Sequence, residues 1–261
     1  MHIMSNSVIS LGLGLGGGKS ATSSGRAAGG GALSNLFSVS LDGTNDHVLM
    51  NSSYDLGCLS LWFKSDATIT KSSLTKALVG FTGVSTFGAF GSIQTGGNVT
   101  GAVTNELITL YTGDWAYAYS SSSGSINTDW HHLAVRWSGS DYEIYLDGNQ
   151  VKNDDGQVVG NQSKAKIPIS SFDVGIRNGS DRAFDGLIDE VAIWSTPLSA
   201  SATAALYNSG VPSDLTDLNP NGWWRMGDND GGTGSTVTDQ GSGGNNGTLT
   251  NGASFNSSVP S

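Results

Sequence analysis

Short segments in which apolar and polar residues alternate recur along most of the chain, and glycine-rich turns separate them. In one such segment Leu59, Leu61 and Phe63 share one face. Ser60 and Trp62 then point to the other face, because successive side chains of a β-strand alternate. A period of two predicts half-buried strands. Many short strands of this kind predict an all-β domain, either a sandwich or a closed barrel.

The same pattern predicts six further strands and one short helix. The strands are expected at residues 107–111, 115–119, 131–137, 142–146, 172–176 and 184–194. The helix is expected from Ala200 to Tyr207, because Ser199 can cap its first turn. Gly210 then stands where a helix often ends in the left-handed conformation.

Composition allows a packed core and argues against several classes of protein. Apolar residues make up 37% of the 261 residues, which argues against wholesale disorder. The net charge is -10 and no dense Lys/Arg stripe occurs, so we expect no nucleic-acid binding. No apolar run is long enough for a membrane helix, and no basic residues precede the first apolar stretch. Neither a membrane span nor a secretory signal peptide is therefore expected. Cys58 is the single cysteine, so no intrachain disulfide can support the fold.

Residues 1–36 are rich in Gly, Ser and Ala and are expected to form a flexible N-terminal arm. Two nucleotide-binding motifs nearly occur in it. The glycines within residues 12–17 fit the dinucleotide spacing, but no amphipathic helix follows them. Residues 18–20 resemble the end of a phosphate loop, but Leu13 stands where the first glycine is required. We interpret both as products of glycine enrichment.

Five strings of residues, in order along the chain, resemble the laminin G-like domains of the concanavalin A-like superfamily (the third laminin G domain type). They are residues 38–48, 59–64, 130–134, 146–148 and 184–194, of which the Trp-His-His-Leu-Ala string at 130–134 is the most recognisable. Each string alone is weak, but five in order are specific, and they cover about residues 36–210. The resemblance implies a concanavalin A-like antiparallel β-sandwich, or jelly roll, over residues 37–261. It also implies mainly structural roles for His131 and His132.

The C-terminal residues 211–261 contain strings that resemble the stretch with which such domains usually begin. These strings lie at residues 223–228 and 246–253, and here they come last. The segment either completes the sheet of its own chain or pairs with a neighbouring subunit. Chain ends that lie close together favour the first arrangement.

The glycine-rich arm, the laminin G-like domain and the C-terminal strings together are similar to structural proteins of marine tailed bacteriophages. This resemblance implies a virion surface component, such as a head decoration, fibre or tail protein. Such a protein is made in the host cytoplasm and exposed by lysis. Its partners are other virion subunits, contacted through the arm or the C-terminal segment. The alternative is a carbohydrate-binding module that recognises host or environmental glycans.

Two sets of residues are candidates for ligand binding. Trp115, Tyr117 and Tyr119 are aromatic residues near a loop that could stack on sugar rings, or could pack within a hairpin or the core. Asp42 and Asp189 lie in strings that match the family, whose members often bind calcium through an acidic side chain and backbone carbonyls. Oxygen ligands suit Ca²⁺. A carboxylate that caps a turn by hydrogen bonds is the alternative role.

Glycosidases of the laminarinase type use the same fold, so we ask whether any two carboxylates of this chain have the spacing that hydrolysis requires. Such enzymes require two carboxyl groups about 5 to 9.5 Å apart. Asp185 and Asp189 share a strand face but should lie about 13 Å apart. Asp189 and Glu190 are adjacent and are expected on opposite faces. We therefore assign no catalytic residues and expect a non-enzymatic protein. A glycosidase whose acid pair comes from different strands is a third, less favoured hypothesis.

Overall fold

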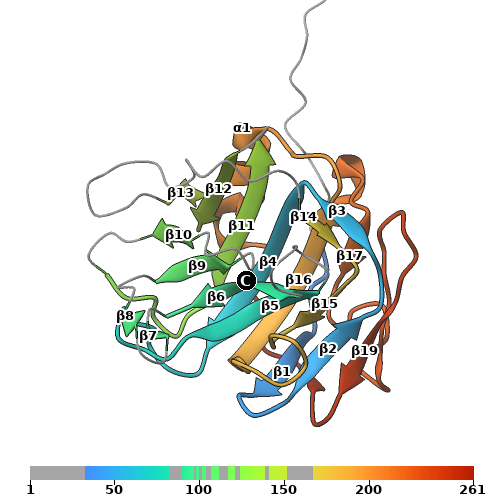
Figure 1. The fold of residues 1–261 in the computed structure, drawn as a ribbon. Helices are drawn as coiled ribbons and strands as arrows, with labels where there is room; N and C mark the ends of the chain where they lie inside the picture. The colour runs from blue at the N-terminus through green and yellow to red at the C-terminus, as the bar shows by residue number, and fades with distance from the viewer. Residues whose placement is uncertain are drawn as a thin grey trace, which may run out of the picture.

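The computed structural model describes residues 33–82, 90–96, 98–99, 102–103, 107–111, 117–120, 124–138, 141–151 and 167–261. Residues 1–32, most of the predicted N-terminal arm, lie outside this part. Within it the chain forms two eight-stranded antiparallel sheets that pack together as a sandwich (Figure 1). The predicted concanavalin A-like β-sandwich is therefore confirmed.

The first sheet has β16 and β4 at its centre. Its order is β13 (Asn149–Gln150), β12 (Asp141–Leu146), β11 (His131–Ser138), β4 (Cys58–Ser65), β16 (Asp185–Trp194), β1 (Ser38–Asp42) and β20 (Ser254–Asn256). A further strand, β17 (Gly222–Trp224), pairs with β16 off this path. The register sets Leu133 of β11 opposite Leu61 of β4, so apolar side chains of neighbouring strands lie side by side in the core.

The second sheet covers the inner face of the first. Its order is β10 (Tyr117–Ser120), β9 (Ile108–Tyr111), β6 (Phe90–Thr95), β5 (Lys76–Thr82), β15 (Ser171–Val174), β2 (His47–Met50), β19 (Gly247–Thr250) and β18 (Thr236–Val237). Two small pairs accompany the sheets: β14 (Ile167–Ile169) with β3 (Tyr54–Leu56), and β7 (Asn98–Val99) with β8 (Ala102–Val103). The main core between the sheets contains Leu59, Leu61 and Phe63, all fully buried, as the alternation predicts.

A second apolar cluster covers the outer face of β4 and its neighbours. It contains Cys58, Ala134 and Trp194 from the strands, with Leu206 and Leu215 from the helical segment that crosses them. This segment holds α1 (Ala200–Ala205) and the 3₁₀ turns η1 (Asn208–Gly210) and η2 (Thr216–Leu218). β4 is consequently buried on both faces.

The helix begins where the sequence predicts. Ser199 Oγ accepts a hydrogen bond from Ala202 N and caps the first turn, as expected. The helix ends two residues earlier than predicted, because the chain turns into η1, in which Ser209 adopts a positive φ of 59°. No helix in the described part of the chain has the length and apolarity needed to cross a membrane.

The C-terminal segment pairs with strands of its own chain. β17 pairs with β16, β19 with β2, and β20 with β1, where Phe255 lies opposite Val39. β19, near the red end of the colour scale, accordingly runs beside the blue strand β2 in Figure 1. Trp224 is fully buried, and its ring makes edge contacts with Phe172 at 5.4 Å and Tyr54 at 6.2 Å. The last fifty residues thus contribute a large side chain to the main core.

We expect Trp224→Ala to lower the free energy of unfolding by about 3–5 kcal/mol, because it removes a large ring from a closed core. Urea denaturation followed by circular dichroism measures this loss. Val211→Ala, at a position that is 45% exposed in the same segment, is the control and should stay within about 0.5 kcal/mol of the parent. A loss below about 1 kcal/mol for Trp224→Ala would contradict a packing role for the segment.

Candidate functional site

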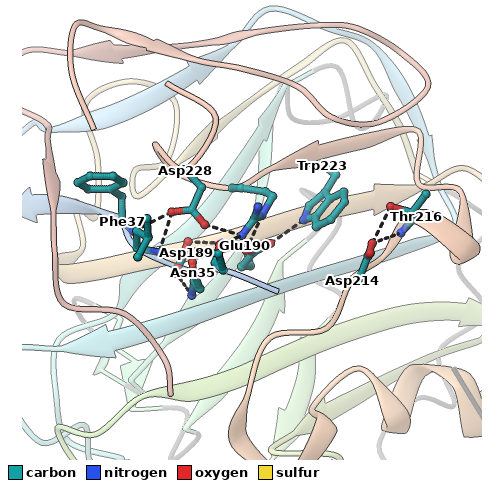
Figure 2. A network of polar contacts seen from close by, with 11 residues as sticks. Asn35, Phe37, Asp189, Glu190, Asp214, Thr216, Trp223 and Asp228 are labelled. Atoms are coloured by element: carbon teal, nitrogen blue, oxygen red, sulfur yellow. Dashed lines mark hydrogen bonds and ion pairs between the residues drawn. The ribbon is translucent and has the colours of Figure 1, made fainter. Parts of the chain in front are cut away.

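A bulge in β16 brings two neighbouring carboxyl groups into one network. The pairing of β16 with β4 shifts register between Asp189 and Ala192, and Glu190 has a φ of +47°. An extra residue in a strand breaks the alternation of side chains. Asp189 and Glu190 therefore join the same buried cluster, and the prediction that they point to opposite faces is wrong (Figure 2).

Glu190 connects β16 to the C-terminal segment. Its Oε2 accepts a hydrogen bond from Trp223 Nε1 at 2.6 Å, and its Oε1 accepts one from Arg225 Nε at 2.9 Å. Arg225 also donates through Nη2 to a carboxylate oxygen of Asp228 and, at 2.6 Å, to the backbone carbonyl of Ser34. One guanidinium thus joins two carboxyl groups and the segment that precedes β1.

Asp228 and Asp189 hold that preceding segment from two sides. Asp228 Oδ1 accepts hydrogen bonds from the backbone N–H groups of Leu36 and Phe37, both at 2.8 Å. Asp189 Oδ2 accepts one from Asn35 Nδ2 at 2.9 Å, while its Oδ1 accepts the N–H of Glu190 at 2.8 Å. The network therefore joins residues far apart in sequence at the place where the two ends of the domain meet.

Burial changes the acidity of this cluster. Asp189 is 0% exposed and Glu190 is 3% exposed. Burial raises the pKa of Glu190 to about 7, although the Arg225 guanidinium and the Trp223 hydrogen bond lower it. Burial, and then the neighbouring Glu190 carboxylate, raise the pKa of Asp189 well above its usual range. The two groups are closed off from water, so no polysaccharide chain can lie across them.

A pocket of about 250 Å³ lies at one rim of the sandwich, near the end of β4 and the starts of β5 and β16. It is lined by Ser65, Ala67, Thr68, Ile69, Ser73, Leu74, Lys76, Thr95 and Asp185. Lys76 and Asp185 bring opposite charges to it, yet they form no ion pair with each other, and neither side chain has a polar partner among the described residues. The pocket therefore offers one cation, one anion and several hydroxyl groups to a ligand.

A family model described as the concanavalin A-like lectin/glucanases superfamily, Laminin_G_3, matches residues 40–204. The chain belongs to this laminin G-like family. No curated protein matches it.

Solved structures share the fold at low sequence identity. A proposed carbohydrate-binding protein from Bacteroides ovatus is 16% identical with a TM-score of 0.60, covering 87% of this chain. The chain spans 62% of that protein's length. Domain 4 of an extracellular arabinanase from Geobacillus stearothermophilus, solved with arabinotriose, is 20% identical, with a TM-score of 0.45 over 65% of this chain and 76% of that one. The CBM40 module of a Ruminococcus gnavus sialidase is 11% identical, with a TM-score of 0.45 over 67% of this chain and 99% of that one.

The two aspartates predicted to bind calcium do not share a site in this laminin G-like domain. Asp42 is exposed and its Oδ1 accepts the N–H of Thr44 at 2.8 Å, a contact that lowers its pKa. Asp42 lies opposite Asp185 in the sheet. Asp185 is four residues from Asp189 along β16, so these two positions are about 13 Å apart. In the described residues no three His, Cys, Asp or Glu side chains are grouped to hold a metal ion. Calcium at either aspartate stays a prediction.

The predicted aromatic platform lies largely outside the described part of the chain. Trp115 falls there entirely. Tyr117 and Tyr119 belong to β10, at the edge of the second sheet, where their backbones pair with Tyr111 and Thr109. Their side chains are not described, so sugar stacking stays a prediction.

The histidines of the Trp-His-His string make structural contacts. His131 Nδ1 lies 2.8 Å from Asp147 Oδ2, and its Nε2 lies 2.8 Å from Asn127 Oδ1. His132 is buried, with its Nε2 2.9 Å from Ser60 Oγ, and burial lowers its pKa to about 4. These contacts fix the loop before β11 and the turn after β12.

Sequence reasoning missed the buried cluster and the rim pocket. The string at residues 223–228 was visible as a family feature, but nothing in it indicates that Arg225 and Asp228 meet Ser34 and Phe37 across some 190 residues. No sequence motif around Lys76 indicates a binding site. Both sites arise from strand pairing rather than from spacing along the chain.

The raised pKa of Glu190 predicts a dependence of stability on pH. The folded protein keeps a proton up to about pH 7 that the unfolded chain releases near its ordinary value of 4.5. Stability should therefore fall between about pH 4.5 and 7, by up to roughly 1.4 kcal/mol per pH unit for one proton. Glu190→Gln should remove this part of the decline, as measured by urea denaturation at pH 5 and pH 7.5. Asp217→Asn, at an exposed position in η2, should leave it unchanged. Equal declines in the parent and Glu190→Gln would contradict the assignment.

Proposed function

We propose that this chain is a non-catalytic, lectin-like module that binds a saccharide in the rim pocket. The observation that carries this proposal is the pair of charges, Lys76 and Asp185, which have no polar partner in the described part of the chain and lie among the hydroxyl groups of the pocket. A carboxylate accepts hydrogen bonds from sugar hydroxyls, and an ammonium group donates to sugar oxygens. Ile69 and the 61%-exposed Leu74 supply the apolar surface on which the C–H face of a sugar ring packs.

Charge favours a neutral saccharide over an acidic one. Lys76 and Asp185 together give the pocket no net charge, while the whole chain carries -10. A polyanionic glycan would meet the repulsion of the whole protein with only one cation to offset it. A neutral sugar is not repelled by the negative charge of the protein, and it can use both charged groups as hydrogen-bond partners.

The arrangement of carboxyl groups supports binding without hydrolysis. Glycoside cleavage requires two carboxyl groups on either side of the bond. Asp185 is the one carboxylate in the described lining of the pocket. Asp189 and Glu190, which do lie together, are buried beneath the C-terminal segment. The Bacteroides ovatus protein that shares this fold is a proposed carbohydrate-binding protein, in agreement with this function.

A second candidate role, display on a virion surface, rests on the way the two ends of the domain are arranged. The C-terminal segment pairs with β1, β2 and β16 of its own chain, which favours the N-terminal arm as the element that contacts another subunit. Residues 34–37 are held by Asp228 and Arg225, so the last residues of the predicted arm have one defined position on the sandwich. A map of an assembled particle in which residues 1–36 are ordered against another subunit would support this role, and a particle that lacks the protein would contradict it.

We expect binding of neutral oligosaccharides, measured by a glycan array and then by calorimetry, with and without calcium. Asp185→Asn and Lys76→Met should each weaken binding about tenfold or more, since each removes a charged hydrogen-bond partner worth roughly 1.5–3 kcal/mol. Asp66→Asn is the matched control, because Asp66 is exposed beside the pocket but does not line it. Affinity of both variants equal to that of the parent would overturn the site. Silence of the array, or release of reducing ends from any glycan bound, would overturn the function.

A further inference from the structure

Residues 34–37, here called the strap, lie against the C-terminal segment just before β1. Leu36 and Phe37 donate their backbone N–H groups to Asp228, and Ser34 offers its carbonyl to Arg225. The ring of Phe37 lies on Gly232, where an added Cβ would come within 2.3 Å of it. The strap therefore packs Phe37 against Gly232 and Gly227, and its polar contacts all lead to the buried cluster.

The charges in this cluster do not balance when all its carboxyl groups are ionised. Asp189 and Glu190 come from β16, Asp228 follows β17, and Arg225 is the one cation that contacts them in the described part of the chain. Asp214 adds a further negative charge nearby: hydrogen bonds from Thr216 lower its pKa most, and the Arg225 guanidinium lowers it further. The side chains of Asp228 and Glu190 are each only 3% exposed, so water does little to screen the excess.

One acceptor on the strap also lacks a donor. Asn35 Oδ1 is buried and has no hydrogen-bond partner among the described residues, although Asn35 Nδ2 donates to Asp189 Oδ2. An unpaired buried acceptor is costly. A carboxyl group that holds a proton becomes a donor as well as an acceptor. A proton on Asp189 would therefore place a donor beside the Asn35 side chain and remove one of the excess negative charges.

We propose that the cluster of Asp189, Glu190, Asp228 and Arg225 is a proton-controlled latch that holds the strap against the sandwich. With a proton on the Asp189–Glu190 pair, one guanidinium faces a smaller excess of negative charge, and the strap is closed. When the pair loses that proton, two adjacent buried carboxylates repel each other and Asn35 has no donor. The strap then separates, and the root of the N-terminal arm is released.

Burial supports this direction of change, because it raises the pKa of both Asp189 and Glu190, the latter to about 7. The latch should therefore be closed below neutral pH and open above it. The device does not depend on saccharide binding, since the rim pocket shares no residue with the cluster.

Hydrogen exchange of the backbone amides of Leu36 and Phe37 in the full chain tests the latch. After correction for the pH dependence of intrinsic exchange, we expect their protection to fall about tenfold or more between pH 6 and pH 8.5. Core amides such as that of Leu61 should keep their protection over this range, which separates opening of the strap from global unfolding. Protection of Leu36 and Phe37 that stays within about twofold over this range would overturn the proposal.

Two isosteric variants show which groups carry the proton. Glu190→Gln and Asp189→Asn each remove one ionisable group, so each should keep the strap protected to within about threefold from pH 6 to pH 8.5. Asp217→Asn, the exposed control, should show the same loss of protection as the parent. A pH-dependent loss that survives unchanged in both variants would assign the effect to other groups and overturn the latch. If either variant does not fold, the other variant and the parent series still decide the outcome.

Discussion

The pairing of β16 on both of its edges is the constraint on which the rest of this sandwich depends. β16 lies between β4 and β1 and also pairs with β17 after its bulge. Nine of its ten residues are buried. Because β16 is buried on both faces, a break in its alternation of side chains must change what is buried next to it. The break is the bulge at Asp189 and Glu190, and beyond it β16 pairs with a third strand, β17. The C-terminal segment and the residues before β1 both attach at this point.

Two carboxyl groups that lie together in this fold can serve to join segments of the chain instead of cleaving a substrate. Asp189 and Glu190 lie together, as the acids of a glycosidase do, but they bond to Asn35, Trp223 and Arg225 and are closed off from solvent. Their chemistry is that of an internal connection whose strength depends on protonation. Accessible polar groups are found instead at the rim, where Lys76 and Asp185 line a pocket and have no polar partner among the residues that the structure describes. The buried connection and the proposed recognition site thus occupy separate parts of one strand, β16.

The rim pocket and the bulge differ in what they cost the stability of the fold. Stability comes from rings such as Trp224, buried between the sheets, and from the outer cluster beneath α1. A side chain at the rim contributes little to that burial, so Lys76 and Asp185 can serve a ligand at small cost to the fold. The Asp189–Glu190 pair, in contrast, is buried at a cost that Arg225 only partly offsets. That remaining cost is what makes the connection sensitive to pH.

The sequence by itself determined the fold class, because alternation with a period of two survives in any sheet that has one buried face. Leu59, Leu61 and Phe63 lie in the main core as the pattern requires, and Ser199 caps the helix that its position predicts.

Only the tertiary structure decided the sites. The bulge reverses the expected direction of a carboxyl group, because one extra residue shifts every later side chain to the other face. Arg225 and Asp228 reach Ser34 and Phe37 through pairings between opposite ends of the chain. Such contacts depend on which strands become neighbours, and no local spacing of residues contains that information.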